Sequence, residues 1–197
     1  MTNQAASLPG SARQALVEAA RELFLEQGFQ ATSLEQVRLR AGVSNGSLYH
    51  HFPTKNHLAR ALYEATLADY HAAVLRAIDD DVPGQEGVRG LVLAHIAWVV
   101  RRPMHARVLH ELRHTTAIAG MEPDWGALNA EAFARLRRWV EARQARGDLR
   151  AMPFAVWLAL VFAPVLQLSA RWAQEGNPVP LRLRALLADA AWAAVGP

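Results

Sequence analysis

One five-residue pattern in this chain is typical of a catalytic metal site. Residues 110–114 read His-Glu-Leu-Arg-His, and on a helix this spacing puts two imidazoles on one face with a carboxylate beside them. Such a set can bind zinc and use the glutamate as a general base in hydrolysis. No histidine follows His114, so a third ligand would have to be Glu131 or Glu141, both on an ordinary charged helix face. We therefore interpret the pattern as a chance match, predict no catalytic residue and no metal, and keep a zinc-dependent hydrolase as the alternative.

A second stretch carries polar side chains suited to a polyanion. The exposed side of a short predicted helix presents hydrogen-bonding groups from Asn45, Ser47, Tyr49 and His50. Such groups bind phosphates and the edges of bases, and an asparagine can bridge adenine in a major groove. Gly46, which has no side chain, allows a close approach of the backbone.

Two short helices and a tight turn must hold these side chains. Ser33 and Gln36 form a capping box, which is a strong signal for the start of a helix. The turn falls at Ala41-Gly42-Val43, where a residue without Cβ is favoured, and Ser44 then caps the second helix. The buried faces come from Leu34, Val37, Ala41, Leu48 and Phe52. This pattern predicts a helix-turn-helix over residues 33–52, and double-stranded DNA as its partner.

The stretch resembles the DNA-binding region of the TetR/AcrR family of transcriptional regulators. The resemblance spans about residues 10–70 and several family positions in order. Those positions are Phe24 and Gly28, Thr32-Ser33, Ala41-Gly42-Val43-Ser44, Leu48-Tyr49-x-His51-Phe52 and Pro53-Thr54-Lys55.

The resemblance implies a set of residues that contact DNA. Tyr49 and His51 match family positions that usually touch phosphate. From their chemistry, Asn45, Ser47 and His50 are expected at base edges. Lys55, in the first turn of the fourth helix, is expected at a phosphate. Ser33 stands at a helix N-terminus, where free N–H groups and the helix dipole favour a phosphate. The full predicted set is Ser33, Ser44, Asn45, Gly46, Ser47, Tyr49, His50, His51 and Lys55.

The rest of the chain predicts an all-α protein of about nine helices. We expect a flexible arm over residues 1–9, a DNA-binding domain over 10–70 and an effector-binding and dimerisation domain over 71–197. Ser11 and Gln14 form a second capping box before the first helix, and Thr54 caps a long fourth helix reaching to about Ile78. That helix is expected to join a three-helix head to a larger helical bundle.

The last two predicted helices favour a homodimer. They are rich in Ala, Leu, Val and Trp, more so than a monomer's surface usually exposes, and members of the resembled family pair through their last two helices. We therefore expect an interface over about 153–194. The apolar run from Phe154 to Leu166 is too short to span a bilayer, so we predict a buried helix there and no membrane partner.

The resemblance also implies a small-molecule effector bound in the larger domain. Small-molecule pockets are mostly apolar and aromatic, with a few polar anchors. The candidate lining is Trp98, His105, Leu109, Arg113, Trp125, Phe133, Phe162 and Gln167. His105, His110 and His114 stay open as ligands of an effector or of a regulatory metal. No cofactor is expected.

Composition and charge limit the kinds of protein this chain can be. The formal net charge is +3, and Lys55 is the single lysine. This charge suits contact with phosphates but is too small for strong sequence-independent binding to DNA. The chain has no cysteine and no basic segment followed by an apolar core at its start, so we expect a cytoplasmic protein without a signal peptide. The sequence thus predicts a repressor released from a palindromic operator by a small molecule. A helical interaction module without DNA binding is a further alternative.

Overall fold

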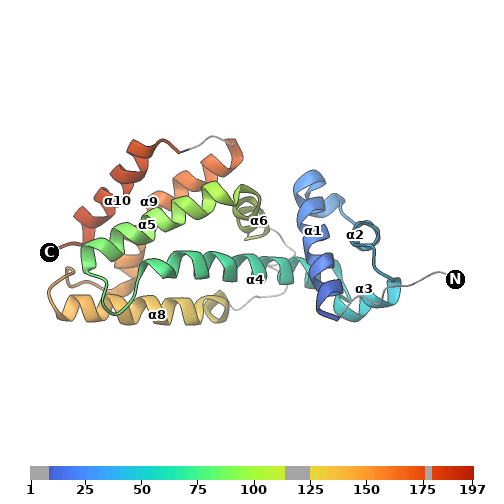
Figure 1. Cartoon of the computed structure of the whole chain (residues 1–197), viewed down its shortest axis with the longest axis horizontal. Coiled ribbons are helices and arrows are strands. Elements are labelled where there is room, and N and C mark those ends of the chain that lie inside the picture. The colour runs from blue at the N-terminus through green and yellow to red at the C-terminus, as the bar shows by residue number, and fades with distance from the viewer. Residues whose placement is uncertain (1–8, 114–124, 176–178) are drawn as a thin grey trace. The chain divides into compact units, whose positions relative to one another are not determined.

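The computed structural model describes residues 9–113, 125–175 and 179–197, and these residues form nine α-helices, one short 3-10 helix and no strand (Figure 1). The predicted all-α class is therefore confirmed. The chain divides into two compact units. The first runs to Thr66 and includes the end of α6 from Val108, and the second contains Leu67–Arg107 with α8, α9 and α10.

The first unit contains α1 (Pro9–Ala31), α2 (Leu34–Ala41), α3 (Asn45–His51) and the first part of α4 (Lys55–Val74). Its core is apolar and comes from every one of these helices. It includes Leu16, Ala20, Leu23, Phe24, Val37, Leu48, Phe52, Leu58 and Leu62. The predicted cap at Ser11 is wrong, because α1 begins at Pro9 and Ser11 lies inside its first turn. Proline is well suited to that position, since its φ is already helical and it needs no N–H partner.

Two predicted helix boundaries near this unit can be compared with the structure. Within α1, Gly28 has φ 84°, a positive value that interrupts the regular helix and is cheapest for glycine. Thr54 accepts a hydrogen bond from the backbone N–H of His57 at 3.3 Å, which confirms its role at the start of α4. α4 ends at Val74, and a 3-10 helix (Leu75–Ala77) continues the chain to the predicted end near Ile78.

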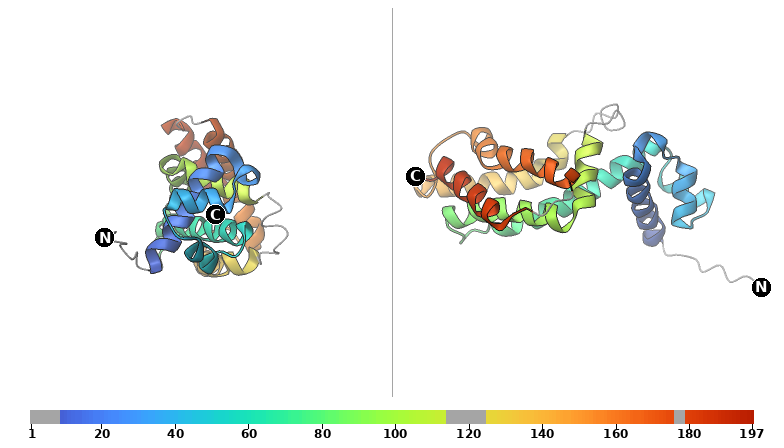
Figure 2. Two further views of the ribbon diagram at one scale, coloured as in Figure 1. Left: turned by 90° about the vertical axis from the view of Figure 1, so that its right-hand side faces the viewer. Right: turned by 90° about the horizontal axis from the view of Figure 1, so that it is seen from above.

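The second unit is built around α5 (Gly84–Arg101), which packs against α9 (Phe154–Glu175) and α10 (Leu181–Val195), as Figure 2 shows from above. The remaining helices are α6 (Pro103–Arg113), shared with the first unit, and α8 (Trp125–Ala145). Val88, Leu91, Val92 and Ile96 of α5 are fully buried, so α5 is the central helix of this unit.

The prediction of a buried helix at 154–166 is wrong for the single chain. One side of α9 is buried through Trp157 and Val161, but Val156 is 47% exposed and Leu160 is 40% exposed. An unbroken apolar run does not reveal that neighbouring helices cover only one of its sides. Over the part of the chain that the structure describes, no helix is long and apolar enough to span a membrane.

Candidate nucleic-acid interface

The start of α2 has the capping box predicted from the sequence. The Ser33 Oγ accepts a hydrogen bond from the Gln36 N–H at 3.1 Å, and the Gln36 Oε1 accepts one from the Ser33 N–H at 2.7 Å. Gln27 of α1 donates to the same Gln36 Oε1 at 3.2 Å. The cap is therefore anchored to the preceding helix as well as to its own first turn.

The turn between α2 and α3 also follows the prediction. Gly42 adopts φ 66°, the left-handed conformation of a helix C-cap. The Arg38 Nη1 donates to the carbonyl of Val43 at 3.0 Å, and the same guanidinium bonds Glu35 at 2.6 and 2.8 Å. Ser44 then caps α3 by accepting from the Ser47 N–H at 3.2 Å. A few local bonds thus set the direction in which α3 leaves the turn.

α3 has one buried and one exposed side. Leu48 and the following Phe52 are almost fully buried in the first unit. On the other side Asn45, Gly46 and His50 are exposed and Tyr49 is 52% exposed, while Ser47 and His51 are half-buried. The structure therefore brings together on one short helix most of the side chains predicted to contact DNA. The DNA contacts themselves stay a prediction.

Gly46 is not needed by the protein's own packing. A Cβ built on Gly46 meets no atom within 4 Å, and its φ is not in the left-handed region. Glycine within a helix costs stability, about 0.5–1 kcal/mol relative to alanine. A residue that is mildly unfavourable for the fold and faces open space is consistent with close approach by another molecule.

The arginines of α2 are held by ion pairs within the first unit. Arg40 bonds Glu22 and Glu26 of α1, with each N–O distance 3.0 Å. The hydrogen bond from Arg40 lowers the pKa of Glu26 below its usual value, and the same pairs raise the pKa of Arg40. These bonds join α2 to α1 across 14 and 18 residues, so sequence patterns over a few residues did not reveal them.

Lys55 makes contacts that the sequence did not suggest. Its Nζ donates to the carbonyls of Phe29, Gln30 and Thr32 at 3.0, 3.2 and 2.9 Å, and lies 4.4 Å from the centre of the Phe29 ring. Partial burial lowers the pKa of Lys55. Its predicted contact with a DNA phosphate stays a prediction.

The residues predicted to line an effector pocket are distributed over different environments. Trp98 and Phe162 are buried, His105 and Leu109 are half-buried, and Phe133 and Gln167 are exposed. The rings of Trp98 and His105 form an edge-on pair with centroids 6.5 Å apart. The side chains of Arg113 and Trp125 lie outside the described residues. The pocket itself stays a prediction.

A buried polar chain in the second unit was missed by the sequence prediction. The Tyr70 hydroxyl lies 2.9 Å from the His95 Nδ1, and the His95 Nε2 lies 2.8 Å from the Ser169 Oγ. Burial lowers the pKa of His95 to about 4, and it also raises the pKa of Tyr70. α4 bonds α5 a second time at the neighbouring residue, because the Trp98 Nε1 donates to Asp69 at 2.7 Å.

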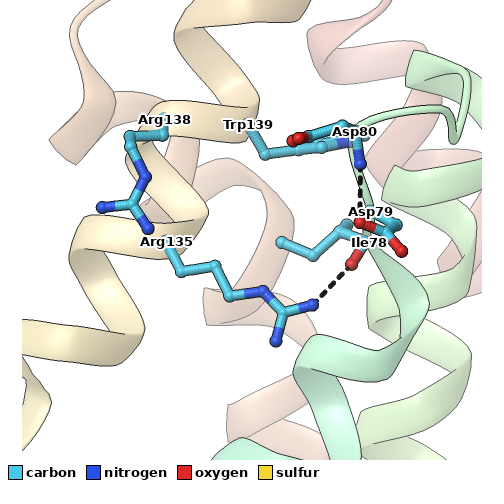
Figure 3. A pocket seen from close by; sticks show the side chains of 6 residues that line it. All are labelled: Ile78, Asp79, Asp80, Arg135, Arg138 and Trp139. Atoms are coloured by element: carbon cyan, nitrogen blue, oxygen red, sulfur yellow. Dashed lines mark hydrogen bonds between the residues drawn. The ribbon is translucent and has the colours of Figure 1, made fainter.

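A hollow of about 280 Å³ lies between the α4–α5 connection and α8 (Figure 3). Ile78, Asp79, Asp80, Arg135, Arg138 and Trp139 line it. Figure 3 shows Arg135 reaching toward the carbonyl of Ile78, to which it donates at 2.9 Å. The hollow shares no residue with the predicted effector pocket, and its mixed charges do not define a ligand.

The metal-site pattern is only partly covered by the structure. His110 is half-buried on α6, whereas His114 lies outside the described residues. Within the described ranges, no group of three His, Cys, Asp or Glu side chains is placed to hold a metal ion.

Sequence comparisons match this chain to regulators. Residues 16–62 fit the family model described as bacterial regulatory proteins, tetR family. The HTH-type transcriptional repressor KstR2 of Mycolicibacterium smegmatis is 24% identical over 88% of this chain and 84% of the relative. KstR2 of Mycobacterium tuberculosis is 30% identical over 66% of this chain and 64% of the relative. NicS, an HTH-type transcriptional repressor of Pseudomonas putida, is 28% identical over 70% and 66%.

Solved structures share the fold. A TetR family transcription regulator from Marinobacter aquaeolei matches with a TM-score of 0.76 at 23% identity, over 95% of this chain and 96% of that one. The SmeT–triclosan complex matches with a TM-score of 0.71 at 22% identity, over 94% and 92%. At such identities the likeness concerns the fold. The relatives named above are regulators, and they give the zinc-hydrolase alternative no support.

Proposed function

This chain belongs to the TetR family of transcriptional regulators, and we propose that it is a repressor released from a palindromic operator when a small molecule binds its C-terminal part. The family is one of ligand-responsive, DNA-binding regulators and not of enzymes. The observation that carries the proposal is the exposed polar side of α3, presented by two capped helices and a glycine turn. We place the boundary of the DNA-binding domain near residue 70 and the protein in the cytoplasm.

The proposed DNA contacts follow from the two sides of α3. With Leu48 buried, Asn45, Ser47 and His50 are directed to base edges, and Tyr49 and His51 to phosphates. Ser33 and Ser44 stand at helix N-termini, where free N–H groups favour phosphate. Two copies of the helix would enter successive major grooves about 34–36 Å apart, which requires a dimer and a palindrome.

The proposed dimer interface is the exposed face of the last two helices. On α9, Val156, Leu160 and Ala163 recur every three or four residues and are all exposed. On α10, Leu186 is 61% exposed. Large apolar side chains exposed in such a row are typical of a protein–protein interface. We expect Leu160→Glu to give monomers in sedimentation velocity, and Leu93→Glu, at the similarly exposed Leu93 of α5, to leave the dimer intact.

The proposed effector binds in the second unit without a resident cofactor. The SmeT–triclosan complex, in which a chain of the same fold is seen with a small molecule, supports this part of the proposal. Coupling between the two sites is reciprocal, so operator DNA must weaken effector binding by the factor by which effector weakens DNA binding.

The test is selection of bound sequences from random duplex DNA by the full chain, followed by titration of the enriched duplex at two salt concentrations. We expect an enriched palindrome, bound by dimers with an affinity that falls as salt rises. No enrichment, with only weak salt-sensitive retention, would contradict the proposal and favour the interaction-module alternative.

A further inference from the structure

The only lysine of the chain has all of its donors occupied by the protein. The Lys55 Nζ lies 3.0, 3.2 and 2.9 Å from the carbonyl oxygens of Phe29, Gln30 and Thr32. An ammonium group has three N–H donors, so three carbonyls satisfy it completely. A phosphate contact would have to replace one of these bonds or share its hydrogen.

These carbonyls lie where α1 loses its regular hydrogen bonding. Gly28, with φ 84°, interrupts the helix; Phe29 and Gln30 lie in the last turn before α1 ends at Ala31, and Thr32 follows directly. The Phe29 carbonyl also accepts from the Thr32 N–H at 3.3 Å. Carbonyls at a helix C-terminus carry a partial negative charge that a cation stabilises. The Phe29 ring, 4.4 Å from the Nζ, adds a cation–π contact. Lys55 therefore acts as a C-cap for α1 that is supplied by α4.

The capped segment leads directly into the helix-turn-helix. Thr32 donates from its hydroxyl to the Gly28 carbonyl at 2.9 Å, and Gln27 donates to the Thr32 Oγ1 at 3.2 Å. The next residue is Ser33, whose capping box with Gln36 starts α2. Lys55, the first residue of α4, thus bonds the segment that sets where α2 begins.

We infer that Lys55 serves DNA binding as a positioning residue, which fixes the first turn of α4 to the corner between α1 and α2, and not as a phosphate ligand. This inference rests on the proposed function. In this arrangement α4 and the helix-turn-helix move together at their junction, because the ammonium group bridges them through three bonds at once.

Lys55→Arg separates the two roles, since it keeps the charge and changes the donor geometry. The planar arginine fork does not reproduce three N–H bonds converging from one nitrogen above a ring. On the duplex selected by the wild-type chain, we expect Lys55→Arg and Lys55→Met to weaken binding by about tenfold or more, as expected for lost charge-assisted hydrogen bonds. The dependence of affinity on salt should be the same for Lys55→Arg and the wild type.

If Lys55 instead binds a DNA phosphate, the affinities of the two variants should differ from those just given. Lys55→Arg would then keep most of the affinity, and only Lys55→Met would lower the salt slope, by about 0.9 for one lost contact. That outcome would overturn the inference. Arg60→Met is the matched control, because it removes one positive charge from the same helix and disrupts a pair, Arg60 with Glu64, that lies within α4. It should bind the selected duplex much more tightly than Lys55→Arg.

A second measurement needs no variant. Because Lys55 is the only lysine, an amine-acylating reagent followed by peptide mass spectrometry reports on its Nζ alone. We expect acylation in the native chain to be at least about tenfold slower than in the urea-unfolded chain, and added duplex to change it little, since three hydrogen bonds already protect the amine. Fast acylation that duplex DNA suppresses would contradict the inference.

The two measurements separate the possible failures. If the wild-type chain retains no duplex, the proposed function fails, and the acylation rate alone decides whether Lys55 is held by the protein. If the wild type binds its duplex and Lys55→Arg binds equally well, the positioning role fails while the proposed function stands.

Discussion

The two units of this protein use polar side chains in opposite ways. In the first unit the polar groups of α3 are exposed, and the bonds that shape the turn before it join residues a few positions apart. In the second unit Tyr70, His95 and Ser169 form a buried chain that joins residues 25 and 74 positions apart. The first arrangement leaves hydrogen-bonding groups available to another molecule, whereas the second satisfies them inside the fold.

This difference bears on what each unit can do. A buried polar group is costly unless it is paired, so the chain through His95 favours one arrangement of α4, α5 and α9. The exposed groups of α3 do not constrain the fold, because Leu48 and Phe52 already anchor that helix. Substitutions of the exposed polar groups of α3 should therefore change binding more than stability, and those in the buried chain should do the reverse.

The largest expected effect is on the pH dependence of stability, through His95. Its pKa is lowered by burial from 6.5 to about 4, so the native imidazole stays neutral. As pH falls from 6.5 towards 4, the unfolded state takes up a proton that the folded state does not, and stability decreases by about 3 kcal/mol in total. His95→Gln cannot titrate. Its stability deficit relative to the wild type, measured by urea unfolding, should shrink over this pH range.

Ser169→Ala is the control for this titration. It removes one partner of His95 and keeps the imidazole, so we expect a loss of about 1 kcal/mol that is similar at every pH. A deficit of His95→Gln that stayed constant from pH 7.5 to 4.5 would contradict the account of a neutral buried histidine. Operator affinity measured at pH 7.5 should change little for either variant.

The next largest effect should be a change in DNA sequence preference when Asn45 is replaced. Asn45 is exposed at the start of α3, and an asparagine that bridges adenine discriminates by about 1–3 kcal/mol at one base pair. We expect Asn45→Ala to lose preference at one position of each half-site in a repeated selection from random DNA, with an unchanged melting temperature. An identical selected site would show that Asn45 does not read a base.

A smaller effect is expected from the cap of α2. Ser33→Ala removes the acceptor for the Gln36 N–H and should cost about 1 kcal/mol in urea unfolding. Because the same N-terminus is a proposed phosphate site, operator and nonspecific duplexes should both be bound more weakly. Ser33→Asp is the matched variant, since it keeps a capping oxygen but adds a negative charge. It should keep the stability and still weaken DNA binding.

Predictions from the sequence were most successful for features that depend on residues close together along the chain. The capping box at Ser33, the turn at Gly42 and the buried Leu48 all follow from patterns within four residues, and all are confirmed. The bonds of Lys55 to α1 and Thr32, and of His95 to α9, were missed, because they join residues 23 to 74 positions apart. Residue types do not indicate such pairs until the helices are placed.

For apolar residues, too, the sequence did not show which side of α9 is buried. Val156 and Trp157 are adjacent and both apolar, yet one is 47% exposed and the other is buried. Composition predicted an apolar helix, but which side its own chain covers depends on the positions of α5 and α10. Hydrophobic periodicity is informative for amphipathic helices and carries little information when both sides are apolar.

The smallest effect should come from Gly46, where stability and binding are expected to move in opposite directions. A Cβ at Gly46 meets no atom within 4 Å, so Gly46→Ala should stabilise the chain by about 0.5–1 kcal/mol through helix propensity. If the backbone approaches DNA there, the added methyl group should still weaken operator binding. Gly87→Ala is the contrast in the second unit, because a Cβ there would overlap the Trp139 ring and should destabilise the fold. A Gly46→Ala chain that is more stable and binds its operator as well as the wild type would mean that α3 leaves room for DNA at this position, and the glycine would then have no role in recognition.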